Sequence, residues 1–239
     1  MKSVLACVCA ELTRCRQTPP QHRNKDREPG GMVAFKWMLM SALVLAFSGC
    51  AQQPHEQKWA MDYIGPKIMQ PLQFTDIASS SGKLESSKDF LGKVVVLYFG
   101  YTHCPDVCPT TMAHLARAEQ LLGPQGKDVQ VIFVTVDPKR DTPKVLDAYV
   151  HAFMSSAIGL SGTVAQTKTL AGRYHVSYSY CKPDAHGNYV VNHSAAIYVF
   201  GPHGNGRLIG TELTPPEGIA HDVHQLLADA HKSWWQKLV

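Results

Sequence analysis

The sequence predicts one mixed α/β domain whose central sheet is flanked by helices. Two apolar runs, Val94–Phe99 and Val129–Val136, are continuous and rich in β-branched and aromatic residues, as expected of strands buried on both faces of a sheet. A helical apolar pattern follows each run, and three further strand patterns precede a last helix. Strands that alternate with helices in this way argue for a single α/β domain.

The composition is that of a globular protein, with 45% hydrophobic and 18% charged residues among 239. The formal net charge of +4 comes partly from a basic cluster within the first thirty residues. No basic stripe with interleaved aromatic residues is visible, so nucleic-acid binding has little support. We therefore expect no nucleic-acid partner.

Residues 1–31 have few apolar residues, no apolar period and several prolines and glycines. We expect this segment either to be disordered or to precede the true start of the protein at Met32. If Met32 is the start, Cys7, Cys9 and Cys15 have no role. Their spacing matches no common metal site.

Residues 32–50 have the pattern of an export signal. Lys36 is followed by the apolar run Trp37–Phe47, which is too short for a comfortable membrane-spanning helix, and then by small residues before Cys50. The segment resembles a bacterial lipoprotein signal, which implies that Cys50 carries a lipid; an uncleaved membrane anchor is the alternative. Either reading places the domain in the cell envelope, membrane-anchored and facing the periplasm. Residues 51–71 are polar and contain proline, so we expect a tether.

The elements from residue 72 onward follow in an order that favours a thioredoxin-like fold. We expect the domain to span residues 72–239 and to open with an N-terminal hairpin extension, formed by Leu72–Ile77 and Lys83–Glu85. The later elements, in chain order, are a strand at Val94–Phe99, a helix at Thr110–Leu122, a strand at Val129–Val136, a helix from Asp141 or Thr142 to about Phe153, a helix at Thr163–Ala171, strands at Val176–Cys181, Ala195–Phe200 and Arg207–Thr211, and a helix from Pro215 through Leu227. A βαβ unit, a connecting helix and a ββα unit make up that fold.

Cys104 and Cys108 lie between a buried strand and a predicted helix, and we expect them to form the functional site. Backbone N–H groups and the helix dipole at such a position favour thiolate, which is both a nucleophile and a soft metal ligand. The spacing is one residue longer than in the C-x-x-C of thiol oxidoreductases, so the pair can close a disulfide or hold a metal. Two buried, inert cysteines are the alternative. The pair alone leaves redox and metal chemistry open.

A third group is needed to separate these chemistries, and His193 is the candidate. It precedes the predicted strand Ala195–Phe200, whose entry loop lies beside the cysteine loop in a thioredoxin-like fold. A lone histidine is more often on the surface or hydrogen-bonded than ligating. His103 is the main rival because it adjoins Cys104.

Three blocks of sequence carry a resemblance to a known family. They are Phe99–Pro109, which contains both cysteines, Val134–Thr142, and Val191–Ser194 leading through Tyr198–Pro202 to Gly204. In their order and separation these blocks resemble the Sco/SenC proteins, which are membrane-tethered, thioredoxin-like copper chaperones for cytochrome c oxidase. The resemblance covers about residues 72–227.

The resemblance implies that Cys104, Cys108 and His193 bind Cu(I) or Cu(II). It implies a metallochaperone rather than an enzyme, with thiol–disulfide reductase activity as a possible addition. The implied partners are the copper-centre subunit of cytochrome c oxidase and other copper chaperones or thiol reductants. Asn192 stands where the family usually has Asp, so we expect the copper affinity or its pH dependence to differ if that carboxylate tunes the histidine.

Asp137 and Asp141 match the second block, and we favour turn formation and helix capping for them over metal binding. Cys181 has no counterpart in the family, and we expect it to be structural. The rival function is a thiol–disulfide oxidoreductase of the cell envelope without copper transfer, which needs both cysteines but not His193. A peroxidase fits the Cys104–Pro109 segment poorly, and a copper or redox sensor stays open.

Overall fold

A computed structural model describes residues 58–235 of the chain. The segments predicted at residues 1–31 and 32–50, with the lipidation at Cys50, therefore lie outside the described residues. Within residues 58–235, no helix is both long enough and apolar enough to cross a membrane.

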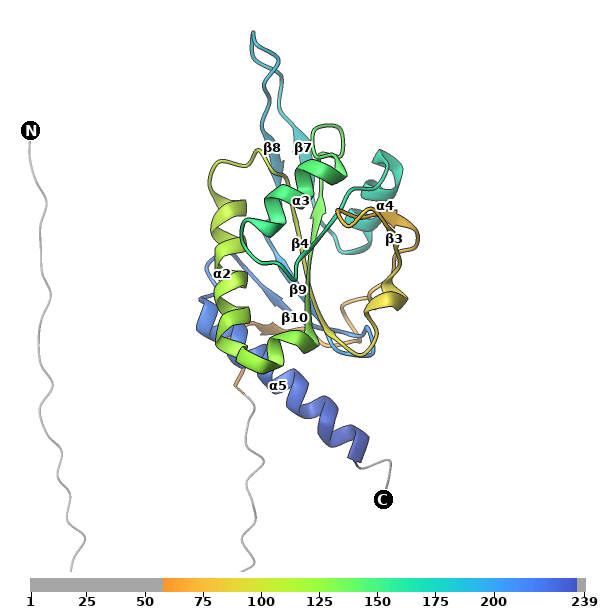
Figure 1. The fold of residues 1–239 in the computed structure, drawn as a ribbon, viewed down its shortest axis with the longest axis vertical. Coiled ribbons are helices and arrows are strands. Elements are labelled where there is room, and N and C mark those ends of the chain that lie inside the picture. Colours follow the sequence, from red (N-terminus) through yellow and green to blue (C-terminus); the bar gives the residue numbers. More distant parts are fainter. Residues whose placement is uncertain (1–57, 236–239) are drawn as a thin grey trace, which may run out of the picture. The chain divides into compact units, whose positions relative to one another are not determined.

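A six-stranded sheet in the order β1-β10-β9-β4-β5-β6 forms the centre of the domain (Figure 1). Strands β4, β5 and β6 are parallel, whereas β9, β10 and β1 pair antiparallel with their neighbours. The strands of this sheet are β1 (Asp62–Tyr63), β4 (Val94–Gly100), β5 (Val129–Thr135), β6 (Ile158–Leu160), β9 (Ile197–Phe200) and β10 (Gly206–Gly210). Two separate two-stranded sheets are formed by β2 (Ile77–Ala78) with β3 (Leu84–Glu85), and by β7 (Tyr178–Tyr180) with β8 (Val191–His193).

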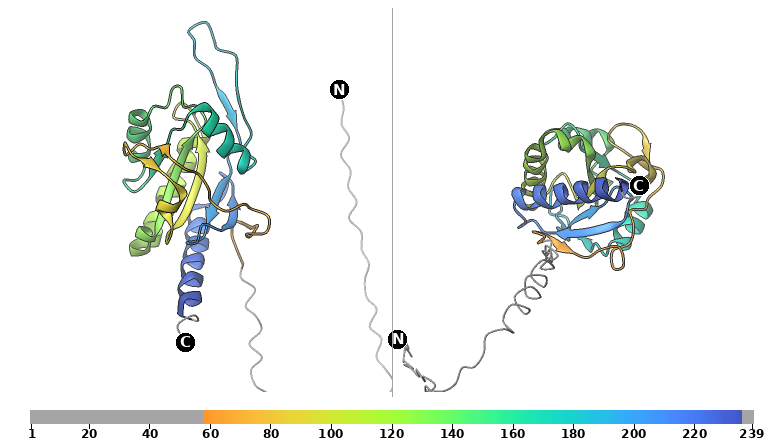
Figure 2. Two further views of the ribbon diagram at one scale, coloured as in Figure 1. Left: turned by 90° about the vertical axis from the view of Figure 1, so that its right-hand side faces the viewer. Right: turned by 90° about the horizontal axis from the view of Figure 1, so that it is seen from below.

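The helices cover both faces of the sheet. Figure 2 shows α2 and α3 on one side of β4 and α4 on the other. The helices are α2 (Val107–Leu122), α3 (Pro143–His151), α4 (Val164–Arg173) and α5 (Pro216–Trp235), with short 3-10 helices η2 (Ser87–Phe90) and η3 (Gly123–Asp128). Successive residues of β4 contact opposite layers: Tyr98 lies against Cys108 of α2, whereas the Phe99 ring centroid lies 6.3 Å from that of Tyr174, after α4. This burial on both faces explains the continuous apolar run of β4.

The predicted α/β class with a central sheet between helices is confirmed, and the expected hairpin is present as β2–β3. One boundary near the cysteines was wrong. Helix α2 begins at Val107 rather than at Thr110, so that Cys108 and Pro109 lie inside its first turn. Proline is tolerated there because N–H groups of the first turn have no partner within the helix.

Two strands of the sheet were not predicted. Strand β6 is short and contains Gly159, which weakens a strand signal; a Cβ atom at this position would lie 2.9 Å from Cβ of Leu146 in α3, so the close packing of helix on strand requires glycine. Strand β1 falls within residues 51–71, where a tether was expected. Residues 58–71 instead pack on the domain, since β1 pairs with β10 and Met61 and Met69 are buried.

Asp222 in α5 holds the segment that enters β1. Its buried carboxylate accepts hydrogen bonds from the N–H of Ala60, at 3.0 and 2.9 Å, and from the N–H of Met61 at 2.7 Å. His221 Nδ1 lies 2.9 Å from the same carboxylate. A buried acceptor that satisfies two backbone donors fixes where the chain joins the sheet.

We predict that Asp222→Ala lowers the free energy of unfolding by about 3 kcal/mol, because two N–H groups lose a charged acceptor in a buried position. Urea denaturation of the purified protein measures the change. The control is Asp147→Ala in α3, where an exposed carboxylate pairs with His151; we expect a change within about 0.5 kcal/mol. Equal losses in the two variants would contradict the assignment.

Candidate metal centre

The two cysteines lie where β4 ends and α2 begins. Residues 101–106 form the connection, called the cysteine loop below; it holds Cys104, whereas Cys108 is the second residue of α2. Cys108 is fully buried and Cys104 is partly exposed. The N–H of Cys108 donates to Sγ of Cys104 at 3.4 Å, while Asp106, at the N-cap, makes no side-chain capping bond. The Cys104 sulfur therefore satisfies one of the free donors of the first helical turn.

His193 is the last residue of β8 and not part of a loop before β9, so this part of the prediction was wrong. Its Nε2 atom lies 3.3 Å from Sγ of Cys108, and its Nδ1 atom lies 3.0 Å from the carbonyl of Ser194. Because a carbonyl only accepts, Nδ1 carries the proton in this bond, which leaves the lone pair of Nε2 facing the sulfur. One ligand atom from each of Cys104, Cys108 and His193 lies within 4.8 Å of the other two.

Burial controls the protonation of this cluster. Burial raises the pKa of the Cys108 thiol to about 12, a shift that outweighs the favourable effect expected from the helix N-terminus. Burial also lowers the pKa of His193, so the imidazole is neutral at pH 7. A charged thiolate in such surroundings is costly unless a cation compensates it. The donor set therefore fits a soft metal ion, which replaces the thiol protons.

Aromatic side chains and a glycine form the wall behind the ligands. The His193 ring stands edge-on to the rings of Tyr98 and Tyr101, with centroid distances of 6.4 and 5.8 Å. The Tyr98 hydroxyl donates to Sγ of Cys108 at 3.7 Å. A Cβ atom on Gly100 would lie 2.8 Å from the same sulfur. This strand end therefore requires glycine to leave room for Cys108.

His103, the rival ligand, lies outside the cluster. Its side chain is 55% exposed, and its Nδ1 lies 3.0 Å from the Thr102 hydroxyl and 3.7 Å from Asp141. Asp141 does not cap α3; Thr142 does, since its side chain accepts from the N–H of Val145. The buried Asp141 carboxylate instead accepts from the N–H and hydroxyl of Thr102, at 2.9 and 2.6 Å, and from the Thr135 hydroxyl at 2.6 Å. It thereby holds the cysteine loop.

Asp137 is also buried, and it pairs with Arg140 and accepts from the Tyr189 hydroxyl at 3.0 Å. Both carboxylates of the second sequence block are thus engaged in protein contacts. Sequence reasoning did not identify Arg140 or Tyr189, although Arg140 belongs to a block that it singled out. The pair of Arg140 with Asp137 is local, but the contacts of both residues with Tyr189 join segments distant in the chain, and no local pattern reports those.

Cys181 and Asn192 contact each other, and Cys181 is not part of the cluster of Cys104, Cys108 and His193. Cys181 is exposed, so the expected structural role of a packed thiol does not fit. The side-chain amide of Asn192 donates to its Sγ at 3.5 Å. Asn192 and His193 are successive residues of β8 and point to opposite faces, so Asn192 is not the hydrogen-bond partner of the imidazole. That partner is the Ser194 carbonyl.

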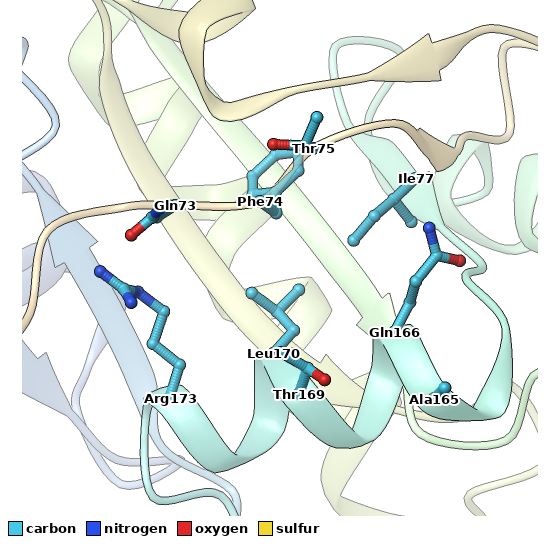
Figure 3. A pocket seen from close by; sticks show the side chains of 9 residues that line it. All are labelled: Gln73, Phe74, Thr75, Ile77, Ala165, Gln166, Thr169, Leu170 and Arg173. Atoms are coloured by element: carbon cyan, nitrogen blue, oxygen red, sulfur yellow. The ribbon is translucent and has the colours of Figure 1, made fainter.

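A cavity of about 410 Å³ lies elsewhere in the domain, between α4 and residues 73–77 (Figure 3). Leu170 and Phe74 form its apolar floor, with Gln166 and Arg173 toward the ends. None of its lining residues is a cysteine, histidine or carboxylate, so it offers no ligand set for a soft metal.

Comparison with known proteins identifies the family. Residues 66–228 match the model of the SCO1/SenC family. The chain belongs to this family. It is 30% identical over 215 residues to the mitochondrial SCO2 homolog of Danio rerio, a match that covers 80% of this chain and 77% of that protein. The chain spans about half the length of several other curated SCO1 and SCO2 relatives.

Solved Sco structures share the fold. The structure of Bradyrhizobium japonicum ScoI with copper bound is 32% identical, with a TM-score of 0.61, and the match covers 65% of this chain and 99% of that one. BsSco, described as a Sco-family cytochrome c oxidase assembly protein with a disulfide switch, is 25% identical with a TM-score of 0.51, covering 66% and 96%. The predicted thioredoxin-like Sco fold is thereby confirmed.

We predict that Gly100→Ala lowers the free energy of unfolding by about 2 kcal/mol, because the added methyl group meets the Cys108 sulfur and the Phe133 ring, at 2.8 and 3.0 Å. Urea denaturation of the metal-free, reduced protein measures the loss. Gly172→Ala in α4 is the matched control, since nothing lies within 4 Å of its Cβ position and alanine favours a helix. A Gly100→Ala variant as stable as the control would contradict this packing.

Proposed function

We propose that this protein is a copper chaperone whose metal site consists of Cys104, Cys108 and His193. The main support for this proposal is that two sulfur atoms and one imidazole nitrogen lie within 4.8 Å of one another at the end of β4. Thiolate ligands select Cu(I), and imidazole also suits copper. The copper bound to the related ScoI supports the same cargo for this chain. Binding of either oxidation state, Cu(I) or Cu(II), is part of the proposal.

Delivery is proposed to proceed by ligand exchange. On binding, the Cys104 and Cys108 thiols release their protons to solvent and form two metal–sulfur bonds. Cys104 is partly exposed, so thiolates of a partner can reach the ion from that side and replace the protein ligands. The proposed recipient is the copper-centre subunit of cytochrome c oxidase, in line with the assembly role stated for BsSco. Other copper chaperones and thiol reductants are the further proposed partners.

The proposed location is the outer side of a cell-envelope membrane, facing the periplasm, with residues 32–50 as the signal or anchor. The support is the short apolar run followed by Cys50 in the sequence. The protein would be attached to the membrane either by a lipid on Cys50 or by an uncleaved helix. Mass spectrometry of the mature N-terminus separates them, because lipidation gives a chain that begins at modified Cys50. An intact Met1 with unmodified Cys50 would rule out the lipoprotein form.

A thiol–disulfide oxidoreductase is the second candidate, favoured by the closeness of the two sulfurs and by the disulfide switch of BsSco. A disulfide requires the sulfurs to approach to about 2.05 Å. The raised pKa of Cys108 makes this residue a poor attacking thiolate at neutral pH. Reductase activity would not require His193, so His193→Ala distinguishes the two functions.

We predict that Cys104→Ala and Cys108→Ala abolish tight Cu(I) binding, because each removes one of two thiolates. His193→Ala is expected to weaken the affinity by about 10-fold to 100-fold while two sulfur ligands remain. Titration against a chromophoric Cu(I) chelator under reducing conditions measures all three. Cys181→Ala is the matched control for loss of a thiol, and we expect wild-type affinity. Unchanged binding in all three site variants would exclude the proposed site.

The affinity for Cu(I) is predicted to rise with pH. Because the Cys108 pKa lies at about 12, this thiol is protonated throughout the range from pH 6 to 8, and the metal must displace its proton. If binding releases one proton, the affinity for Cu(I) rises about tenfold for each unit of pH. The proton released by Cys108 is by itself enough to produce a slope of this size. Competition titrations at several pH values, corrected for protonation of the chelator, measure it. An affinity that does not change with pH would contradict a buried thiol as ligand.

A further inference from the structure

The ribbon formed by β7 and β8 carries His193 but does not belong to the six-stranded sheet. The two strands pair only with each other in the described part of the chain. Figure 1 shows the ribbon and its connecting loop projecting from the domain. A two-stranded ribbon alone is marginally stable in water. The position of His193 relative to the two sulfurs therefore depends on contacts between the ribbon and the rest of the domain.

Several of those contacts involve Arg140, in the connection between β5 and α3. Its Nη1 group donates to the carbonyl of Tyr189 at 2.9 Å, and its guanidinium lies 3.7 Å from the centroid of the Tyr189 ring. Its Nε group pairs with Asp137, which also accepts from the Tyr189 hydroxyl. One further bond joins the Tyr180 hydroxyl of β7 to the carbonyl of Val136 at 2.7 Å. Strand β7 and the segment that leads into β8 are thus fastened to the same connection.

The same guanidinium also faces the cysteine loop. It lies 5.6 Å from the centroid of the Tyr101 ring, which is almost fully buried and whose ring stands edge-on to His193. Arg140 therefore contacts both the segment that leads into the strand of the histidine and the loop that carries Cys104. We propose that Arg140 is a positioning residue that holds His193 at bonding distance from a metal on the two cysteines. This inference rests on the proposed copper site.

An arginine is required at this position by the geometry of its contacts. A guanidinium is planar, so it can stack on an aromatic face and donate hydrogen bonds in several fixed directions. An ammonium is a compact charge that neither stacks nor donates in fixed directions. Lysine would retain the positive charge beside Asp137 but lose the stacking on Tyr189 and the bond to its carbonyl. Arg140→Lys therefore separates the charge of the residue from its positioning role.

The test is a double-mutant cycle in Cu(I) affinity on the full chain, with wild type, Arg140→Lys, His193→Ala and the double variant. We expect Arg140→Lys to weaken binding by about 10-fold to 100-fold in the wild-type background and to have no further effect beside His193→Ala. X-ray absorption should show the nitrogen ligand lost in Arg140→Lys with both sulfurs kept. The control is Arg207→Lys, whose guanidinium lies 5.6 Å from the ring centroid of Tyr63 at another strand pair.

Wild-type copper affinity in Arg140→Lys would overturn the inference. An equal loss of affinity with and without His193 would also overturn it, because a general structural defect does not depend on His193. A second readout uses the metal-free chain. Hydrogen exchange at residues 178–193 should accelerate in Arg140→Lys while β4 stays protected. If wild type binds no copper, the proposed function fails, and the exchange rates still decide whether Arg140 holds the ribbon; unchanged exchange there overturns that role.

Discussion

The parallel pairing of β4 with β5 is the constraint on which the metal site depends. Parallel strands end at the same edge of a sheet, so the connections after Gly100 and Thr135 lie side by side. The N–H of Val136 donates to the carbonyl of Gly100 at 2.8 Å and extends the pairing beyond the strands. Asp141 then reaches across to hold Thr102. Backbone pairing thus positions the cysteine loop before either sulfur meets a metal.

Burial at this edge creates a conflict that a metal ion resolves. Cys108 lies inside the first turn of α2, against Tyr98 and Gly100, in surroundings that disfavour a thiolate. The same surroundings keep His193 neutral, with Nε2 free to bind. Without a cation the cluster is a protonated thiol beside a neutral imidazole. A metal at the proposed site would offset most of the buried negative charge of the thiolates, so neither the empty nor the loaded cluster leaves an uncompensated buried thiolate.

The sequence predicted the parts whose signals are local. Long apolar runs identified β4 and β5, and Thr163 correctly marked the start of α4 because its capping contacts lie within four residues. Strands of two or three residues, such as β1 and β6, carry no periodic signal and depend on the partner strands beside them. The sequence likewise associated His193 with the cysteines but could not show the ribbon that carries it, since β8 has only three residues.

Contacts between distant segments decide the remaining roles. Asp137 and Asp141 suggested turns and caps because both residue types favour such positions. Asp137 does open a turn, since the N–H of Arg140 donates to its carbonyl, but Asp141 caps no helix. Each carboxylate also binds a residue that only the fold brings near, Tyr189 for Asp137 and Thr102 for Asp141. A change of one position along a strand reverses the face to which a side chain points. This alternation directs Asn192 toward Cys181 and away from the imidazole, so the departure from the family pattern at Asn192 lies on the far side of the strand.

The three proposed ligands differ in how firmly the fold holds them, and this difference bears on the release of a metal. Cys108 belongs to α2 and is enclosed by the core, so it cannot withdraw without disturbing the packing. Cys104 lies in a loop and is partly exposed, and His193 lies on a ribbon outside the main sheet. A metal at the proposed site would be bound to one fixed ligand and to two ligands on separately attached segments. Exchange with a partner would then begin at the exposed sulfur while Cys108 retains the ion, and the attachment of the ribbon would set how readily the imidazole follows.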